Sequence, residues 1–342
     1  MSETRASPKK RWDLVVRVLL IATTVISLWW FLRGLDARAF SDTLTRADVP
    51  LLVVAVLLNL VAQVVRAGSW VVMLGPRHQP PAGRLLRYEF AAQAASSISP
   101  ARAGELLRLW MLKHEGVPVG ITGALIVLKK TIGAACMGLL ALATPLLVPG
   151  LPGWVTGFVI GVSALMLVLL GLLVATAYRA RANRLPKMLH SMVDGMYFLK
   201  DRLRFSSASC LILVGEMIDV AAAYAVMRAL HIGLSVAAVV LVVFFIDFSN
   251  VLPGAPANLG TFEVGAVYCL SLLHVAPDAA LGFALLFHAQ QVLPQVVVGL
   301  PLQLHFLSVR KKQPGANDPA TNGPATIGTA TTAPPLVRSD HD

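Results

Sequence analysis

Residues 153–178 read GWVTGFVIGVSALMLVLLGLLVATAY and carry no charged side chain. About 20 consecutive apolar residues cross the hydrocarbon core of a bilayer as one helix, so this stretch is long enough to span a membrane. Similar apolar runs occur elsewhere in the chain, at 14–32, 49–74, 119–148, 206–230 and 279–305. The pattern predicts an all-α polytopic membrane protein with six full transmembrane helices.

The composition agrees with this class of protein. The 342 residues are 56% hydrophobic and only 14% charged, whereas about a quarter of a soluble domain is charged. The net charge of +11 does not indicate nucleic-acid binding, because the basic residues are concentrated in loops between apolar runs. Cys136, Cys210 and Cys269 lie far apart in apolar runs and form no CxxC pair. We expect no metal, cofactor or disulfide framework.

The distribution of Lys and Arg predicts the orientation of the spans, since cytoplasmic loops carry an excess of both. Loop 75–88 has three basic residues and loop 178–204 has seven. On the opposite side, loop 33–48 has three that are balanced by three aspartates, and the turn at 149–152 has none. Each terminal segment carries four. Both termini are therefore expected to face the cytoplasm.

The two terminal segments are expected to lie outside the membrane domain. Residues 1–13 form a basic cytoplasmic tail in this interpretation, and the apolar run that follows exceeds the length of a signal-peptide core, so we expect it to be retained. Residues 311–342 are rich in Pro, Ala, Thr and Gly without hydrophobic periodicity. This composition predicts a disordered cytoplasmic tail.

Two further apolar stretches, 84–113 and 234–276, are interrupted near their middles by Ser, Pro and Gly. These residues break helices. Given the predicted orientation, the first stretch enters and leaves the membrane from the cytoplasm, with its tip at Ser96–Pro100. The second enters and leaves from the outside, with its tip at Leu252–Pro256. We therefore predict two re-entrant helical hairpins.

The two tips share a motif, Pro-x-x-x-Gly followed by an acidic residue, at Pro100–Glu105 and Pro256–Glu263. The halves 14–148 and 153–305 would each contain two spans, a hairpin and one more span in opposite orientations. Such an inverted repeat with broken helices indicates a transport site near the bilayer midplane. The alternative is a bundle of eight transmembrane helices, because residues 234–252 are long enough to cross alone.

Ionisable residues within the apolar stretches are the candidate site residues. A charge at the bilayer centre costs at least ~2.5–3.5 kcal/mol, so such a side chain should pair or face water. The N-termini of the broken half-helices favour an anion, which in a membrane indicates a phospholipid phosphate. The candidates for headgroup binding are Arg66, Arg102, Glu105, Lys129 and Glu263. Candidates for charge balance or proton coupling are Glu216, Asp219, Asp247 and His288.

Several of these residues have a structural alternative. We expect Arg108 and Lys113 at the membrane interface, where long basic side chains reach lipid headgroups. Arg66, on the same helix face as Asn59 and Gln63, lies near the end of its span and could do the same. Adjacent Lys129 and Lys130 should point in different directions, so at most one should face a cavity. Both lysines lie well inside the span 119–148.

Other polar and small residues could serve packing alone. Glu216 and Asp219 could pair with the lysines of the span 119–148 and hold helices together. His288 by itself is more typical of a hydrogen-bonded core histidine than of a proton carrier. A stripe of small residues predicts helix packing, at Gly153, Gly157 and Gly161.

At Ser99–Arg108 and Asn258–Glu263 the chain resembles the lysylphosphatidylglycerol synthase transmembrane family. The resemblance covers roughly 14–306 and implies that 14–310 form one flippase-like transmembrane domain. It implies movement of a charged or bulky lipid between leaflets; aminoacylated phosphatidylglycerol is the best-known cargo, and other members are associated with isoprenoid-related or hopanoid lipids. The positions that it implies for the site are Arg102, Gly104, Glu105, Gly260 and Glu263.

The sequence departs from the family in two ways. About 35 residues follow the last span, too few for the soluble aminoacyl-transferase domain that many members carry. Lipid lysylation by this chain is therefore not expected, and lysylphosphatidylglycerol is less favoured as the cargo. Many relatives carry an acidic residue followed by a basic one where this chain has Lys129 and Lys130, which favours a more anionic headgroup here.

These features predict a flippase or scramblase for a charged or anionic phospholipid in the bacterial cytoplasmic membrane. One alternative is an accessory protein that presents a lipid to an envelope-lipid synthesis enzyme. Another is a membrane-embedded lipid-modifying enzyme. Signatures such as GxSxG, HExxH or a phosphate-binding loop do not occur in the sequence. We therefore expect the chain not to be an enzyme.

Overall fold

The structure is a computed structural model of the chain. The residues that it describes are 45, 47–76, 78, 80–98, 104–179, 187–251, 258 and 260–311. The predicted first span and N-terminal tail, Arg102, the Leu252–Pro256 tip and almost all of the C-terminal tail lie outside these residues.

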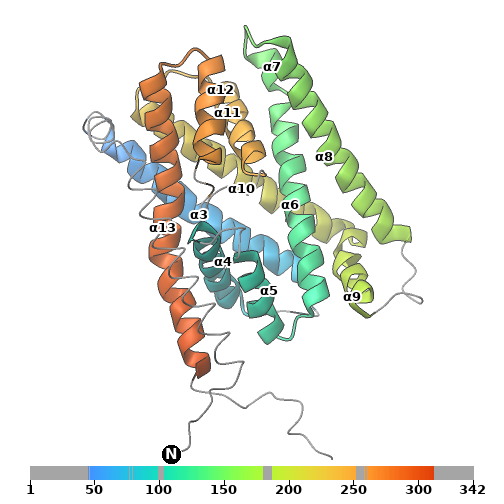
Figure 1. Ribbon diagram of the computed structural model, residues 1–342. Coiled ribbons are helices and arrows are strands. Elements are labelled where there is room, and N and C mark those ends of the chain that lie inside the picture. The colour runs from blue at the N-terminus through green and yellow to red at the C-terminus, as the bar shows by residue number, and fades with distance from the viewer. Residues whose placement is uncertain are drawn as a thin grey trace, which may run out of the picture. The chain divides into compact units, whose positions relative to one another are not determined.

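The described residues form helices and no strand (Figure 1). The longer helices are α3 (Val49–Leu74), α6 (Val119–Ala141), α8 (Gly153–Arg179), α10 (Arg202–Ala229) and α13 (Pro277–Lys311). The shorter ones are α4 (Ala82–Ile98), α5 (Gly104–His114), α7 (Thr144–Leu147), α9 (Lys187–Gly195), the 3₁₀ helix η3 (Met196–Lys200), α11 (Val236–Ser249) and α12 (Thr261–Leu272).

Among the described residues, five helical segments are long and apolar enough to cross a membrane. They are Val49–Leu74, Val119–Leu147, Gly153–Arg179, Arg202–Ala229 and Pro277–Leu304. Their bounds lie close to those of five predicted spans, and the remaining predicted span falls outside the described residues. The chain is therefore an all-α polytopic membrane protein.

Local sequence explains where several of these helices begin and end. The Asp201 side chain accepts a hydrogen bond from the Arg204 backbone N–H at 3.2 Å and caps α10. The Ser235 side chain does the same for α11, with the Ala238 N–H at 3.3 Å. Helix α3 ends at Gly75, whose φ of +63° suits glycine. Such caps satisfy backbone groups that the helix itself leaves unpaired.

Each interrupted stretch forms two short helices that pack against each other, α4 with α5 and α11 with α12. At about 1.5 Å per residue, the 11 residues of α5 and the 12 of α12 give lengths well below the ~30 Å of a hydrocarbon core. Neither helix can cross on its own. This geometry favours re-entrant hairpins over eight transmembrane helices.

The two hairpins meet α13 at different heights. The Phe262 ring of α12 stacks on His288 of α13, with a centroid distance of 4.3 Å. Further along α13, the Ser97 hydroxyl of α4 lies 3.3 Å from the Gln295 amide oxygen, and a Cβ at Gly299 would lie 2.2 Å from the Phe90 carbonyl oxygen. In Figure 1, α13 accordingly passes α11–α12 first and α4 afterwards. This placement supports hairpins that enter from opposite sides.

The predicted packing role of one small-residue stripe is not found in the described part of the chain. A Cβ added at Gly153, Gly157 or Gly161 would meet no described atom within 4 Å. Helix α8 instead packs on α6 through Ser163, whose hydroxyl donates to the Gly138 carbonyl at 3.0 Å. The glycine stripe lies on the outward face because the opposite face of α8 is the one that reaches α6.

Candidate functional site

A buried carboxylate, Glu89 on α4, organises the charged residues between the helices. Only 2% of Glu89 is exposed. Its Oε2 accepts a hydrogen bond from Arg108 Nη2 at 3.0 Å, and its Oε1 lies 3.5 Å from Lys129 Nζ. Our sequence analysis did not single out this residue. The rule that identified the other candidates, an ionisable group inside an apolar stretch, would have found it.

Arg108 is buried and paired with two carboxylates, so the expectation that its side chain extends to lipid headgroups was wrong. Its guanidinium bonds Glu89 and also Glu105 Oε2 at 2.9 Å, and it lies 5.0 Å from the centre of the Trp70 ring. The reason is the hairpin itself, which turns this face of α5 towards α4 and α3. Lys113, at the end of α5, is exposed.

Both lysines of the adjacent pair line the same cavity, so the expectation that at most one would do so was also wrong. Lys129 Nζ donates to the Arg66 carbonyl at 3.1 Å and approaches Glu89. Lys130 Nζ lies 2.9 Å from Glu105 Oε1. The two Cα–Cβ bonds diverge around α6, but the long side chains converge again on carboxylates of α4 and α5.

Arg66 of α3 forms an ion pair with Asp219 of α10. The sequence left open whether Arg66 reaches the lipid headgroups and whether Asp219 pairs with the lysines of α6. Arg66 does not extend to the lipid headgroups, and Asp219 pairs with this arginine and not with the lysines of α6. On the same face of α3, Asn59 and Gln63 are buried. Among the described residues, no hydrogen-bond partner reaches Asn59 Oδ1 or either amide atom of Gln63.

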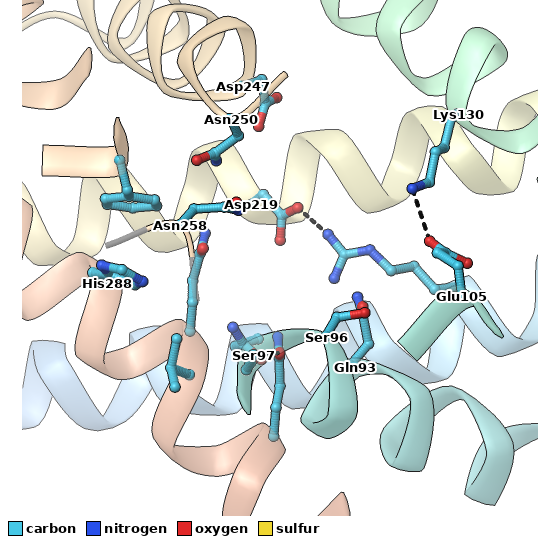
Figure 2. Close-up of a pocket in the computed structure, with 16 residues that line it drawn as sticks. Gln93, Ser96, Ser97, Glu105, Lys130, Asp219, Asp247, Asn250, Asn258 and His288 are labelled. Atoms are coloured by element: carbon cyan, nitrogen blue, oxygen red, sulfur yellow. Dashed lines mark hydrogen bonds and ion pairs between the residues drawn. The ribbon is translucent and has the colours of Figure 1, made fainter. Parts of the chain in front are cut away.

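Two adjoining cavities lie between these helices. One, of about 300 Å³, is lined almost entirely by polar side chains from both hairpins and from α3, α6, α10 and α13. Figure 2 shows Lys130 and Glu105 at one end of this polar cavity, His288 and Asn258 at the other, and Asp219 between them. The buried Asn59 Oδ1 on its wall has no hydrogen-bond partner among the described residues, which indicates space for water or a polar ligand.

The second cavity, of about 620 Å³, shares part of its wall with the first. The shared residues are Arg66, Gln93, Glu105, Lys130, Asp219, Asp247 and Asn250. Glu89, Arg108, Lys129 and Glu216 line only the second cavity. Its remaining wall is largely apolar and comes mainly from α6, α8, α10 and α11, including Met137, Val162, Met166, Ile212, Phe244 and Phe248. We call the two the polar cavity and the apolar-walled cavity.

The second hairpin places Glu263 beside His288. Glu263 Oε1 lies 2.6 Å from His288 Nδ1, and its Oε2 accepts the Gly260 backbone N–H at 2.7 Å. The latter bond caps the first turn of α12 and is one half of a capping box, since Gly260 has no side chain to form the other half. A backbone donor that we expected to bind a ligand anion is thus occupied by this carboxylate. His288 is buried, as expected of a hydrogen-bonded core histidine, and its ring also lines the polar cavity.

The two motif glycines have different surroundings. A Cβ at Gly104 would lie 1.9 Å from the Ala92 carbonyl oxygen, so glycine allows α5 to approach α4. A Cβ at Gly260 would meet no described atom within 4 Å, and its φ of +87° is the reason for glycine there. The sequence match between the tips therefore does not extend to the local role of each glycine.

Most of the predicted charged residues come together, and a few do not. Arg66, Glu105, Lys129, Glu216, Asp219 and Asp247 surround the apolar-walled cavity. Glu263 and Gly260 line neither cavity, and Glu263 contacts His288, which lines the polar cavity. Within the described residues, no group of three or more His, Cys, Asp or Glu side chains could hold a metal ion.

Comparison with known proteins identifies the family of this chain. Residues 14–299 match the family model described as the lysylphosphatidylglycerol synthase TM region. No curated protein and no solved structure matches the chain. The matched model describes the membrane part of that family, which is distinct from its catalytic part. Because the match covers most of the chain, the protein belongs to the lysylphosphatidylglycerol synthase transmembrane-region family.

Proposed function

We propose that this protein moves a charged phospholipid between the leaflets of the bacterial cytoplasmic membrane, as a flippase or a scramblase. In this proposal both termini are cytoplasmic and the two hairpins enter from opposite sides. The observation that carries the proposal is the pair of adjoining cavities, one polar and one with an apolar wall, inside a bundle of membrane-spanning helices. Family membership relates the chain to membrane lipids.

The cost of burying ionisable side chains between these helices supports a role for them other than stabilising the fold. Nine ionisable side chains surround the apolar-walled cavity, four of them basic and five acidic. A buried ion pair often stabilises a protein no better than apolar residues of similar volume would. In a membrane protein, ionisable groups that face an internal cavity typically mark a substrate or ion path. A lipid headgroup is the charged molecule most abundant beside such a bundle.

The two kinds of wall fit the two parts of a lipid. The headgroup would occupy the polar cavity between Lys130 and His288, where charged and amide groups replace its water shell. The chains would follow the apolar wall formed by residues such as Val162 and Phe248. Because charges of both signs are present, anionic and aminoacylated phospholipids are the first headgroups to test, followed by polyisoprenoid and hopanoid lipids.

Reconstitution into liposomes tests the proposal. Purified protein is inserted into vesicles that contain a trace of fluorescent phosphatidylglycerol, lysylphosphatidylglycerol or phosphatidylcholine, and an impermeant reductant quenches the outer leaflet. We expect the inner-leaflet fluorescence of at least one charged lipid to become accessible faster than in protein-free vesicles, with or without an ion gradient.

Two other outcomes would overturn lipid movement as the function. If a charged lipid binds but does not cross under any gradient, the accessory role of presenting lipid to an envelope-lipid synthesis enzyme is favoured. If mass spectrometry shows a chemically altered lipid after incubation, the chain is an enzyme.

A further inference from the structure

The four basic residues around the apolar-walled cavity differ in how firmly they are held. The side chains of Arg108 and Lys129 are 7% and 14% exposed, and that of Arg66 is 21% exposed. Lys130 is 47% exposed. It also lines both cavities, as does its partner Glu105 (Figure 2). Lys130 is therefore the cation that a molecule in either cavity reaches most readily.

Of the three other cations, Arg66 is ion-paired with Asp219, and the other two each have more than one partner. Arg108 bonds both Glu89 and Glu105. Lys129 contacts Glu89, donates to the Arg66 carbonyl, and lies 5.2 Å from the centre of the Trp70 ring. Displacing either would leave Glu89 without one of its buried partners. Breaking a buried ion pair in this way costs about 3–5 kcal/mol, so these residues are suited to hold the site together.

Lys130 can leave its partner without that penalty. The two oxygens of Glu105 have different partners, since Oε1 faces Lys130 at 2.9 Å and Oε2 accepts from Arg108 at 2.9 Å. If Lys130 turns towards a ligand, Glu105 keeps its bond to Arg108. The carboxylate remains neutralised, and the lysine exchanges one anion for another. Lysine suits this exchange because it acts as a flexible point charge with three donors.

We propose that the Lys130–Glu105 ion pair is the exchangeable contact of the site, in which a phosphate group displaces Glu105 from Lys130. This inference rests on the proposed lipid transport for its biological role, but it concerns the binding step alone. The ligand class is a phosphate ester or inorganic phosphate. Glu105 then acts as an internal competitor of the ligand and sets its affinity, while Lys129 and Arg108 have structural roles.

The proposal predicts opposite effects for the two partners of one ion pair. Glu105→Gln removes the competing charge, so phosphate should bind about fivefold more tightly, the upper range for a partly exposed pair. Lys130→Ala removes the ligand's partner, so phosphate should bind at least about tenfold more weakly. Lys130→Arg should retain binding. The double variant should resemble Lys130→Ala, because the competitor matters only when the lysine is present.

Equilibrium binding to the full chain in dodecyl maltoside micelles, a detergent without phosphate, tests these expectations. The probes are short-chain phosphatidylglycerol and inorganic phosphate, titrated separately. The control is Lys113→Ala, an exposed lysine on the same hairpin and outside both cavities, which should bind like the wild type. Thermal unfolding of each variant confirms that the protein is folded.

The two probes distinguish the source of the ligand. If both bind with the expected order of affinities, phosphate alone is sufficient. If only the lipid does, the apolar wall contributes, and the exchange at Lys130 is equally supported. The proposal is overturned if a folded Glu105→Gln variant binds the probes with an affinity equal to or lower than that of the wild type. It is also overturned if a folded Lys130→Ala variant binds them with the affinity of the wild type. The proposal is also overturned if the wild type binds neither probe.

The result is independent of the transport assay. Lipid movement that fails in liposomes, together with the expected order of affinities, would contradict the proposed function and leave the exchangeable contact intact. Lipid movement in liposomes without the expected order of affinities would contradict only the exchangeable contact.

Discussion

At the scale of single residues, one carboxylate has the largest structural role in the site. Glu89 is buried on α4 and contacts the side chains of Arg108 on α5 and Lys129 on α6. Without this carboxylate, the packing of α4, α5 and α6 would bring two cations together in an apolar setting. The pattern of ion pairs thus divides the charged residues into a buried part around Glu89 and an accessible part at Lys130.

Neutralising Glu89 should therefore destabilise the protein strongly. Glu89→Gln leaves Arg108 with only Glu105 and leaves Lys129 without a carboxylate partner among the described residues. We expect a loss of about 3–5 kcal/mol, measured as a lower unfolding temperature in detergent. The matched control is Asp278→Asn, an exposed acid in the first turn of α13, which should cost no more than about 1 kcal/mol. Equal stability of the two variants would contradict this role of Glu89.

At the scale of helices, the hairpins depend on close contact between their two arms. Gly104 allows α5 to approach α4, and Gly265 allows α12 to approach α11, where a Cβ would lie 2.4 Å from the Ser249 hydroxyl. Without these contacts the arms would separate, and the charged residues that the first hairpin carries would move apart. Hairpin packing therefore positions Glu89, Glu105 and Arg108.

Adding one methyl group at the first hairpin should disturb it. Gly104→Ala would place a Cβ 1.9 Å from the Ala92 carbonyl, and overpacking of this kind costs about 1–3 kcal/mol. Thermal unfolding would measure the loss. Gly123→Ala is the control, because a Cβ at this glycine of α6 would meet no described atom within 4 Å, and alanine favours a helix by up to about 1 kcal/mol. A Gly104→Ala variant as stable as Gly123→Ala would argue against the tight hairpin.

Cysteine labelling tests whether the hairpins enter from opposite sides. In a variant without Cys136, Cys210 and Cys269, a cysteine at Ser97 should react with an impermeant reagent only from the cytoplasm. A cysteine at Val251, which is exposed at the end of α11, should react only from the outside. If Val251→Cys reacts from the cytoplasm instead, residues 234–276 cross the membrane twice and the chain has more spans than we propose.

At the scale of the whole molecule, the sequence predicted the membrane architecture better than the contacts within the site. Apolar runs are long and local, so five predicted spans match helices, and Ser, Pro and Gly located both interruptions. Which cation meets which carboxylate depends on how helices pack, and that information is not local. The expectations that Arg108 would extend to the membrane interface and that at most one of Lys129 and Lys130 would face a cavity were therefore wrong, although charge inside an apolar stretch had marked the site.

The central claim is that the charged cavity carries a lipid headgroup through the bundle. The most direct measurement is the rate at which fluorescent phosphatidylglycerol crosses liposome membranes that contain the wild type, Lys130→Ala or Lys113→Ala. We predict rapid movement with the wild type and Lys113→Ala, and movement about tenfold slower with Lys130→Ala, equivalent to about 1.4 kcal/mol. Equal rates for all three proteins, or no movement above protein-free vesicles, would contradict the claim.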